Sequence, residues 1–180
     1  MQKTPLEAKK TASIEAFFQH YAHTLKALAH PRRLEIVHLL RDQAMCVTDL
    51  AEMLGIPQAN LSQHLLILKR VGIVRIDRNR KYVYYRLTDP NIIKACDLLR
   101  DMLIRDQSLK TDGQKILNDL PNGKLVTDPV CGMTISTSAA LFSHAHDAKQ
   151  YHFCASGCYE LFLKNPKQYI QGSDVSVIHA

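Results

Sequence analysis

The sequence lacks several features that would place it in other classes of protein. No hydrophobic run approaches the roughly 18 residues that a membrane-spanning helix requires, and the polar N-terminus MQKTPLEAKK leads into no apolar signal segment. There is no glycine-rich phosphate loop, no nucleotide-binding fingerprint, no nucleophile–base pair and no internal repeat. We therefore expect a cytoplasmic protein that is not an enzyme and has no membrane partner.

Cysteine is scarce. Five of the 180 residues are cysteines, namely Cys46, Cys96, Cys131, Cys154 and Cys158. In the cytoplasm these side chains should be reduced thiols, available for metal or redox chemistry rather than for structural disulfides. A chain of this length accommodates one domain of ordinary size and a second, smaller one.

The positive charge is concentrated in one segment. The formal net charge is +6; residues 1–107 hold 17 Lys and Arg against 11 Asp and Glu, whereas residues 108–180 hold six of each. The segment from Gln58 to Arg86 carries seven Lys and Arg against the single acid Asp77. A local excess of this size indicates a polyanionic partner and marks where its phosphates would lie.

Hydrophobic periodicity predicts four helices followed by a β-hairpin. The expected helices cover residues 13–29, 31–40, 48–54 and 57–71. Thr48 is the expected N-cap of the third helix, and Gly55 is expected just past its end. From Val74 to Leu87 the apolar residues alternate, which predicts two strands joined at a tip over residues 78–81, where Asn79 is able to take a left-handed turn conformation.

A last long helix is expected from the N-cap Asp89 to about residue 107. Its apolar stripe is too wide for a helix with one covered side, so part of it is expected to meet a partner subunit. The domain boundaries follow from composition. We expect a first domain over 1–107, a linker over 108–124, a second compact domain over 125–171 and a tail over 172–180.

Two short helices with a glycine-containing turn, followed by a basic hairpin, are the parts of a winged helix-turn-helix. We predict a mainly α fold with a small β-hairpin wing, whose second helix enters the major groove of double-stranded DNA. Gln and Asn side chains there can read an adenine edge, and the basic tip can lie along the phosphates. The candidate DNA-binding residues are Gln58, Asn60, Ser62, Gln63, His64, Arg78, Arg80 and Lys81. For His64, helix packing is the alternative role.

The segments LKALAHPRRLEIVHLL, VTDLAEMLGIPQANLSQHLLILKRVGIV and RKYVYYRL together resemble the ArsR/SmtB family of metal- and stress-responsive repressors. The resemblance covers about residues 15–105, with its landmarks in family order. It implies a homodimer built through the first and last helices and an inverted-repeat operator. It also implies that an inducer releases the DNA.

The family's two well-known inducer sites are incomplete here. One opens the third helix with two cysteines, as in ELCVCDL; Cys46 matches the first, and Thr48 replaces the second. The other is a zinc site on the last helix, whose four positions correspond here to Asp89, Asn91, Met102 and Arg105. Three of these four residues cannot serve as ligands of that site. The resemblance therefore leaves Cys46 and Cys96 as single thiols.

These two thiols have open roles. Cys96 lies on the apolar stripe of its helix, which favours a place in the core. Cys46 precedes a helix, where a thiol can be more reactive. Should the two approach each other, they can form a persulfide- or disulfide-sensing pair, as in some relatives.

The C-terminal segment carries a second constellation. Cys131 lies in the turn DPVCGM, and about twenty residues later YHFCASGC places Cys154 and Cys158 four apart, as a strand end followed by a helix start would. Three thiols can converge on one thiophilic ion such as copper, zinc or an arsenic- or mercury-type ion. A fourth ligand can come from His144, His146 or His152.

This pattern resembles the YHS domain, a short metal-associated module of heavy-metal ATPases and related proteins, over about residues 126–170. The serine expected directly after Cys154 is replaced by Ala155. We predict a small α+β, treble-clef-like domain, in which the metal is either sensory or structural only.

Three functions remain open. The first is a dimeric repressor that releases its operator on sensing a thiophilic metal or metalloid. The second keeps the repressor but makes Cys46 and Cys96 the sensors of a sulfur or redox species. The third is a metal-trafficking or metal-buffering protein, against which the basic segment from Gln58 to Arg86 argues.

Overall fold

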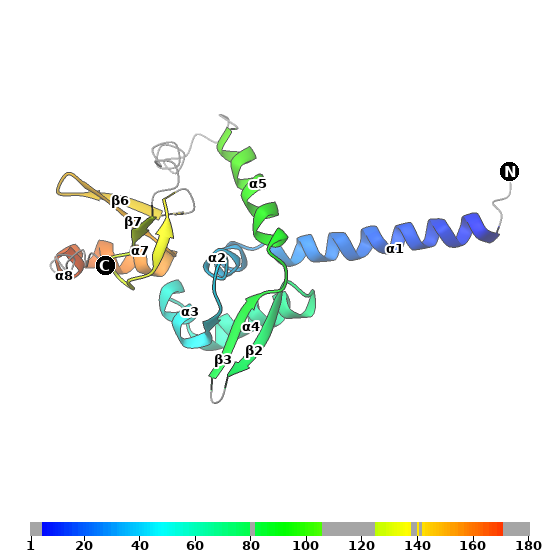
Figure 1. Cartoon of the computed structure of the whole chain (residues 1–180), viewed down its shortest axis with the longest axis horizontal. Coiled ribbons are helices and arrows are strands. Elements are labelled where there is room, and N and C mark those ends of the chain that lie inside the picture. Colours follow the sequence, from blue (N-terminus) through cyan, green and yellow to red (C-terminus); the bar gives the residue numbers. More distant parts are fainter. Residues whose placement is uncertain (1–4, 80–81, 106–124, 138–139, 141, 171–180) are drawn as a thin grey trace, which may run out of the picture.

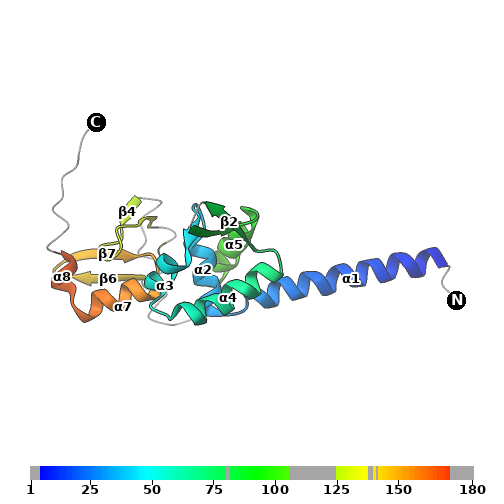
Figure 2. The same ribbon diagram turned by 90° about the horizontal axis from the view of Figure 1, so that it is seen from below.

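The computed structural model describes residues 5–79, 82–105, 125–137, 140 and 142–170 (Figure 1). A helical first part with a three-stranded sheet is followed by a second part of two β-hairpins and two short helices. Helix α1 (Pro5–Leu28) extends away from the other elements, on the side opposite the second part (Figures 1 and 2). The predicted linker (108–124) and the predicted tail (172–180) both lie outside the described residues.

Local signals account for several helix ends. Helix α2 (Pro31–Leu39) begins at a proline, and the Nδ1 atom of His30 accepts the backbone N–H of Arg32 at 3.1 Å. Helix α3 (Val47–Leu54) ends just before Gly55, whose φ of 63° is the left-handed conformation typical of a glycine that caps a helix. The predicted position of Gly55 just past the helix end is confirmed.

Two predicted helix starts are wrong. Helix α1 begins at Pro5 rather than near residue 13, because residues 5–12 are helix formers without the apolar stripe on which the prediction rests. The N-cap of α3 is Cys46 rather than Thr48, and its side chain makes no capping hydrogen bond. Cys46 also belongs to a strand, whose pairing holds it in the extended conformation that an N-cap requires.

The strands of the first part form one antiparallel sheet in the order β1-β3-β2. Its strands are β1 (Met45–Cys46), β2 (Val74–Asn79) and β3 (Tyr82–Leu87). Two residues are too few for periodicity to reveal, so β1 was not predicted. Asn79 pairs with Tyr82 inside the ladder and so is a strand residue, which corrects the predicted turn. Arg80 and Lys81, which were predicted at the tip of the wing, lie outside the described residues.

Helices α4 (Gln58–Arg70) and α5 (Asn91–Arg105) complete the first part. Asp89 accepts the N–H of Asn91 at 2.7 Å, as an N-cap does. The core of the first part is built from the apolar faces of α2, α3 and α4, and its fully buried side chains include Ile36, Leu39, Leu50, Leu54, Leu61, Leu65 and Leu68. The helices α3 and α4 with the β2–β3 hairpin make a winged helix-turn-helix.

The second part is α+β. Its strands pair as two antiparallel hairpins, β4 (Leu125–Thr127) with β5 (Thr134–Ser136), and β6 (Phe142–His146) with β7 (Lys149–Phe153). Helices α7 (Ser156–Lys164) and α8 (Pro166–Ile170) follow. A small core joins β7 to α7 through Tyr151, Phe153, Cys158 and Phe162. Helix α7 lies beside α3 of the first part (Figures 1 and 2).

Among the described residues of the single chain, exposed apolar side chains are most numerous on two helices. On α1 these are Ile14, Phe17, Phe18, Tyr21 and Leu25, and on α5 they are Leu98, Leu99, Met102 and Leu103. In the part of the chain that the structure describes, no helix combines the length and hydropathy that crossing a membrane demands.

Candidate DNA-binding surface and metal centre

The start of α4 presents polar side chains to solvent. Leu61, Leu65 and Leu68 turn into the core, which leaves the other face of the helix outward. The exposed polar residues in its first turns are Gln58, Asn60, Ser62 and Gln63. An exposed helix start that follows a helix-turn-helix turn has the geometry for reading base edges. Contact of these residues with DNA stays a prediction.

His64 sits differently from its neighbours. It is half-buried, and its ring centroid lies 4.7 Å from that of His30. Burial lowers the pKa of His64, and the nearby His30 and Arg33 lower it further. The neutral ring packs against the start of α2, so the geometry favours the packing role over base reading.

The wing is basic and exposed where the structure describes it. Arg78 is exposed near the end of β2. Arg75 and Arg86 flank Asp77, at 3.7 and 3.4 Å between nitrogen and carboxylate oxygen. Pairs this exposed stabilise the fold little, so both guanidinium groups remain available to phosphates.

The three C-terminal thiols come together. Cys131 lies in the turn between β4 and β5, Cys154 follows β7, and Cys158 lies in the first turn of α7. The Sγ atom of Cys154 lies 3.6 Å from the Sγ atom of Cys131 and 3.6 Å from that of Cys158. Tetrahedral coordination with zinc–sulfur bonds of about 2.3 Å would set the sulfurs roughly 3.8 Å apart. The described geometry thus fits a single soft ion.

Asp128 is a fourth member of this cluster, and sequence reasoning missed it. Its ligand atom and the three sulfurs all lie within 4.8 Å of one another. The side chain is fully buried, and its two oxygens accept the backbone N–H groups of Val130 and Cys154, each at 2.8 Å. Asp128 therefore joins the Cys131 loop to the end of β7, and a carboxylate oxygen is available as a ligand. Its position three residues before Cys131 was the available signal.

The thiols do not titrate alike. Hydrogen bonds from Cys154 and Cys158 lower the pKa of Cys131 to about 3, which makes it the thiolate of the group. The same interaction with Cys131, together with burial, raises the pKa of Cys154 and that of Cys158. A cluster of three thiols in which one ionises readily can take up a soft cation by releasing protons.

The three histidines predicted as alternative ligands lie elsewhere on the β6–β7 hairpin. His144 and His146 pack their rings against Phe162, with centroids 6.1 Å apart in both cases. His152 is buried, and burial lowers its pKa. Among the described residues, the group that could hold a metal ion contains no histidine.

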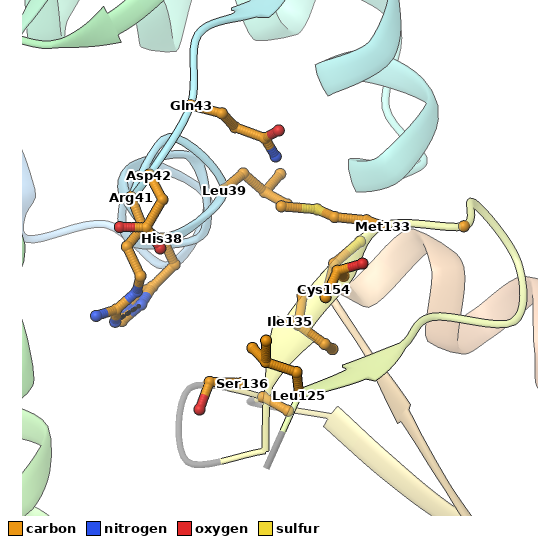
Figure 3. A pocket seen from close by; sticks show the side chains of 13 residues that line it. His38, Leu39, Arg41, Asp42, Gln43, Leu125, Met133, Ile135, Ser136 and Cys154 are labelled. Carbon is orange, nitrogen blue, oxygen red and sulfur yellow. Dashed lines mark hydrogen bonds between the residues drawn. The ribbon is translucent and has the colours of Figure 1, made fainter. Parts of the chain in front are cut away.

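A pocket of about 480 Å³ separates the end of α2 from the β4–β5 hairpin (Figure 3). Its lining includes His38, Leu39 and Gln43 on one side, and Met133, Ile135 and Cys154 on the other. The cysteine cluster therefore borders a cavity between the two parts of the chain.

The other two cysteines occupy the first part. Cys96 is buried on the core-facing side of α5, and burial raises the pKa of its thiol. Cys46 is partly buried at the start of α3. A raised pKa leaves Cys96 a thiol at neutral pH, and a sensing role for this pair stays a prediction.

Comparison with known families gives two matches. Residues 30–75 match the family described as "Bacterial regulatory protein, arsR family", and residues 126–173 match the YHS domain. The NmtR transcriptional regulator of Mycobacterium tuberculosis is 37% identical over 93 residues, which cover 52% of this chain and 72% of that protein. The chain belongs to the ArsR family. Both resemblances that the sequence suggested are thereby confirmed.

Other ArsR-family relatives carry repressor names. The SmtB repressor of M. tuberculosis is 46% identical over 68 residues, 38% of this chain. The chain spans only half the length of SmtB. The biofilm growth-associated repressor of Xylella fastidiosa is 44% identical over 78 residues, 43% of this chain and 68% of that protein. The crystal structure of the X. fastidiosa repressor BigR aligns at a TM-score of 0.45 and 35% identity, covering 51% of this chain and 94% of that one.

Proposed function

We propose that this protein is a homodimeric, DNA-binding transcriptional repressor that releases its operator when the C-terminal cysteine cluster binds a thiophilic metal ion. The observation that carries the sensing step is the convergence of Cys131, Cys154 and Cys158 on one point. Family membership and the repressor names of the relatives support the DNA-binding role.

The DNA-binding step rests on exposure and charge. Gln58 and Ser62 are exposed at the start of α4, and Arg78 is exposed on the wing. The basic segment continues through the hairpin tip with Arg80 and Lys81. We infer that α4 reads an inverted-repeat operator while the wing contacts phosphates.

The dimer rests on two apolar faces. Phe17 and Phe18 of α1 are 63% and 60% exposed, and Leu98 of α5 is 69% exposed. Side chains of this size on two helices are costly to leave in water. We infer that a second copy of the chain covers both faces, as the width of the apolar stripe on α5 predicts.

The sensing step rests on the donor set. Thiolates select thiophilic cations, and the carboxylate of Asp128 can complete a four-ligand shell. The chain's own contribution is to hold Cys131 ionised and to fix its loop to the end of β7 through Asp128. Copper, zinc and arsenic- or mercury-type ions share this chemistry.

The test is a comparison of two cysteine variants of the full-length protein. Wild type should bind the DNA of its own promoter without metal, bind about one ion per chain, and release the DNA on metal addition. Replacing Cys131, Cys154 and Cys158 by Ser should abolish ion binding and leave the protein on DNA. The matched control, Cys46→Ser with Cys96→Ser, should behave as wild type.

Repeating the experiment with a persulfide in place of the metal decides between the alternatives. If the control variant loses its response to the persulfide while the triple variant keeps it, the sulfur-sensing function replaces the metal-sensing one. If wild type does not bind promoter DNA in the absence of metal, the repressor role fails and metal trafficking or buffering becomes the better function.

A further inference from the structure

The residues between two of the candidate ligands are packed against the winged domain. Ala155, directly after Cys154, is fully buried and belongs to the same core cluster as Leu54 and Leu65. Gly157, directly before Cys158, is buried as well. The short segment that separates two metal-site thiols is therefore also a contact with the DNA-binding part of the chain.

The closest approach is between two glycines. A Cβ atom on Gly157 would lie 2.5 Å from the carbonyl oxygen of Met53 and 2.6 Å from the carbonyl carbon of Leu54, and it would overlap the backbone nitrogen of Gly55. Each of these atoms belongs to the end of α3 or to the turn that leads into α4. Only glycine at position 157 permits this contact.

A polar contact fixes the same helix start. The N-cap of α7 is Ala155, which offers no capping side chain. Glu35 of α2 takes that role, because its carboxylate accepts the backbone N–H of Ser156 at 3.2 Å and the Ser156 hydroxyl at 2.6 Å. Arg32 donates to Glu35 at 3.2 Å, to the carbonyl of Leu54 at 3.4 Å and to the Ser156 hydroxyl.

A second contact lies on the other side of the cluster. Met133, two residues after Cys131, packs against the core of the winged domain and reaches toward Leu39 at the end of α2 (Figure 3). Both the Cys131 loop and the start of α7 are thus attached to the first part. A change in the positions of the thiols therefore alters these two contacts with the first part.

We infer that α2 and the helix-turn-helix turn form a docking surface for the start of α7, and that this contact links the cysteine cluster to the reading helix. The inference rests on the proposed function for its effect on DNA. The docking itself is independent of any ion. The first turn of α7 holds Cys158 and contacts Gly55, and Gly55 joins α3 to α4. An ion bound by the three sulfurs is therefore linked through this contact to the position of α4.

Gly157→Ala in the full-length protein is the sharpest test. Alanine is a better helix former than glycine, so the substitution favours α7 itself while its methyl group blocks the contact. The matched control is Glu160→Ala, at an exposed position of the same helix. In metal-free protein, hydrogen exchange of peptides covering residues 53–57 and 154–158 should be faster in Gly157→Ala than in wild type, and unchanged in Glu160→Ala.

The effect on coupling is measured with zinc as the probe. Wild type should lose promoter affinity by about tenfold or more on zinc addition, as a typical allosteric effector causes. Gly157→Ala should bind zinc within a few-fold of wild type, yet its promoter affinity should change by less than about twofold. Glu35→Gln, which lies outside the C-terminal module, should weaken the coupling in the same direction.

The outcomes separate the docking contact from the proposed function. Wild-type exchange rates in metal-free Gly157→Ala, or a full zinc response in both variants, would overturn the docking inference. Loss of zinc binding in Gly157→Ala with an unaltered response in Glu35→Gln would also overturn it, because the glycine then serves the metal site alone. If wild type responds to no ion while the exchange difference persists, the sensing function fails and the docking stands.

Discussion

Arg41 and Asp97 form a bidentate ion pair, with both guanidinium nitrogens 2.7 Å from the two carboxylate oxygens. The pair joins the loop after α2 to α5, and each side chain is about three-quarters shielded from solvent. Burial alone would raise the pKa of Asp97, but the hydrogen bonds and charge of Arg41, aided by Arg100, hold it below its ordinary value.

Removing one partner of this pair should destabilise the first domain. Asp97→Asn leaves the Arg41 charge half-buried without its carboxylate, which should cost about 1–3 kcal/mol in the free energy of unfolding at pH 7. Urea denaturation at fixed protein concentration measures this. The matched control is Asp77→Asn, whose ion pairs are far more exposed, and its loss should stay below about 1 kcal/mol. Equal losses in the two variants would contradict the expectation that the shielded Arg41–Asp97 pair stabilises the domain more than the exposed pairs of Asp77 do.

His38 should make stability fall in mild acid. Burial and then the charge of Arg41 lower its pKa to about 4, although Asp97 opposes them. The Nδ1 atom of His38 faces the Arg41 guanidinium at 3.2 Å and must stay unprotonated to accept from it. The unfolded chain takes up the proton near pH 6.5, so stability is complete above that pH and is lost as pH falls toward 4.

The measurement is unfolding as a function of pH. Between pH 6.5 and 4 wild type should lose up to roughly 3 kcal/mol more than His38→Gln, which keeps an acceptor but cannot protonate. The low pKa of Asp97 places its own contribution at more acidic pH, so the two are separable. Parallel pH profiles for wild type and variant would show that His38 is not responsible.

The sequence predicts those features of the fold that depend on neighbouring residues. Gly55 and Asp89 end and begin their helices as expected, because glycine conformation and Asx capping are local properties. Thr48 fails as a cap because strand pairing with β3 decides the conformation of Cys46, and that pairing comes from a distant segment. Local signals cannot report it.

The candidate site follows the same division. The spacing of Cys131, Cys154 and Cys158 in the sequence was enough to predict that the three thiols converge on one ion. The place of Asp128 depends on its hydrogen bond to the backbone of Cys154, a residue of another hairpin. The contact of Gly157 with Gly55 joins two segments with no shared periodicity, so it required the structure.

Base reading by α4 and phosphate contact by the wing should separate experimentally. Gln58→Ala or Ser62→Ala should weaken operator binding by about 1–3 kcal/mol each and leave binding to random DNA nearly unchanged. Arg78→Ala should instead weaken both and lower the salt dependence by about one charge. Fluorescence anisotropy over a salt series measures both. Equal losses on operator and random DNA for Gln58→Ala would assign that residue to phosphate contact.

A truncation that ends at Leu120 tests whether sensing belongs to the second part. All buried members of the winged core except Ala155 lie between Ala27 and Cys96. Losing buried Ala155 and the partly buried Met133 and Cys154 that pack against this core should cost about 2–4 kcal/mol, and α1 and α5 remain intact. The truncated protein should therefore fold, bind the operator and form a dimer, which analytical ultracentrifugation measures. It should no longer release the operator when a thiophilic metal is added.

Continued release by metal would place the sensor in the winged domain, with Cys46 as the first candidate. Release by a persulfide that is lost on replacing Cys46 or Cys96 by Ser would establish sulfur sensing and leave the second part with another task.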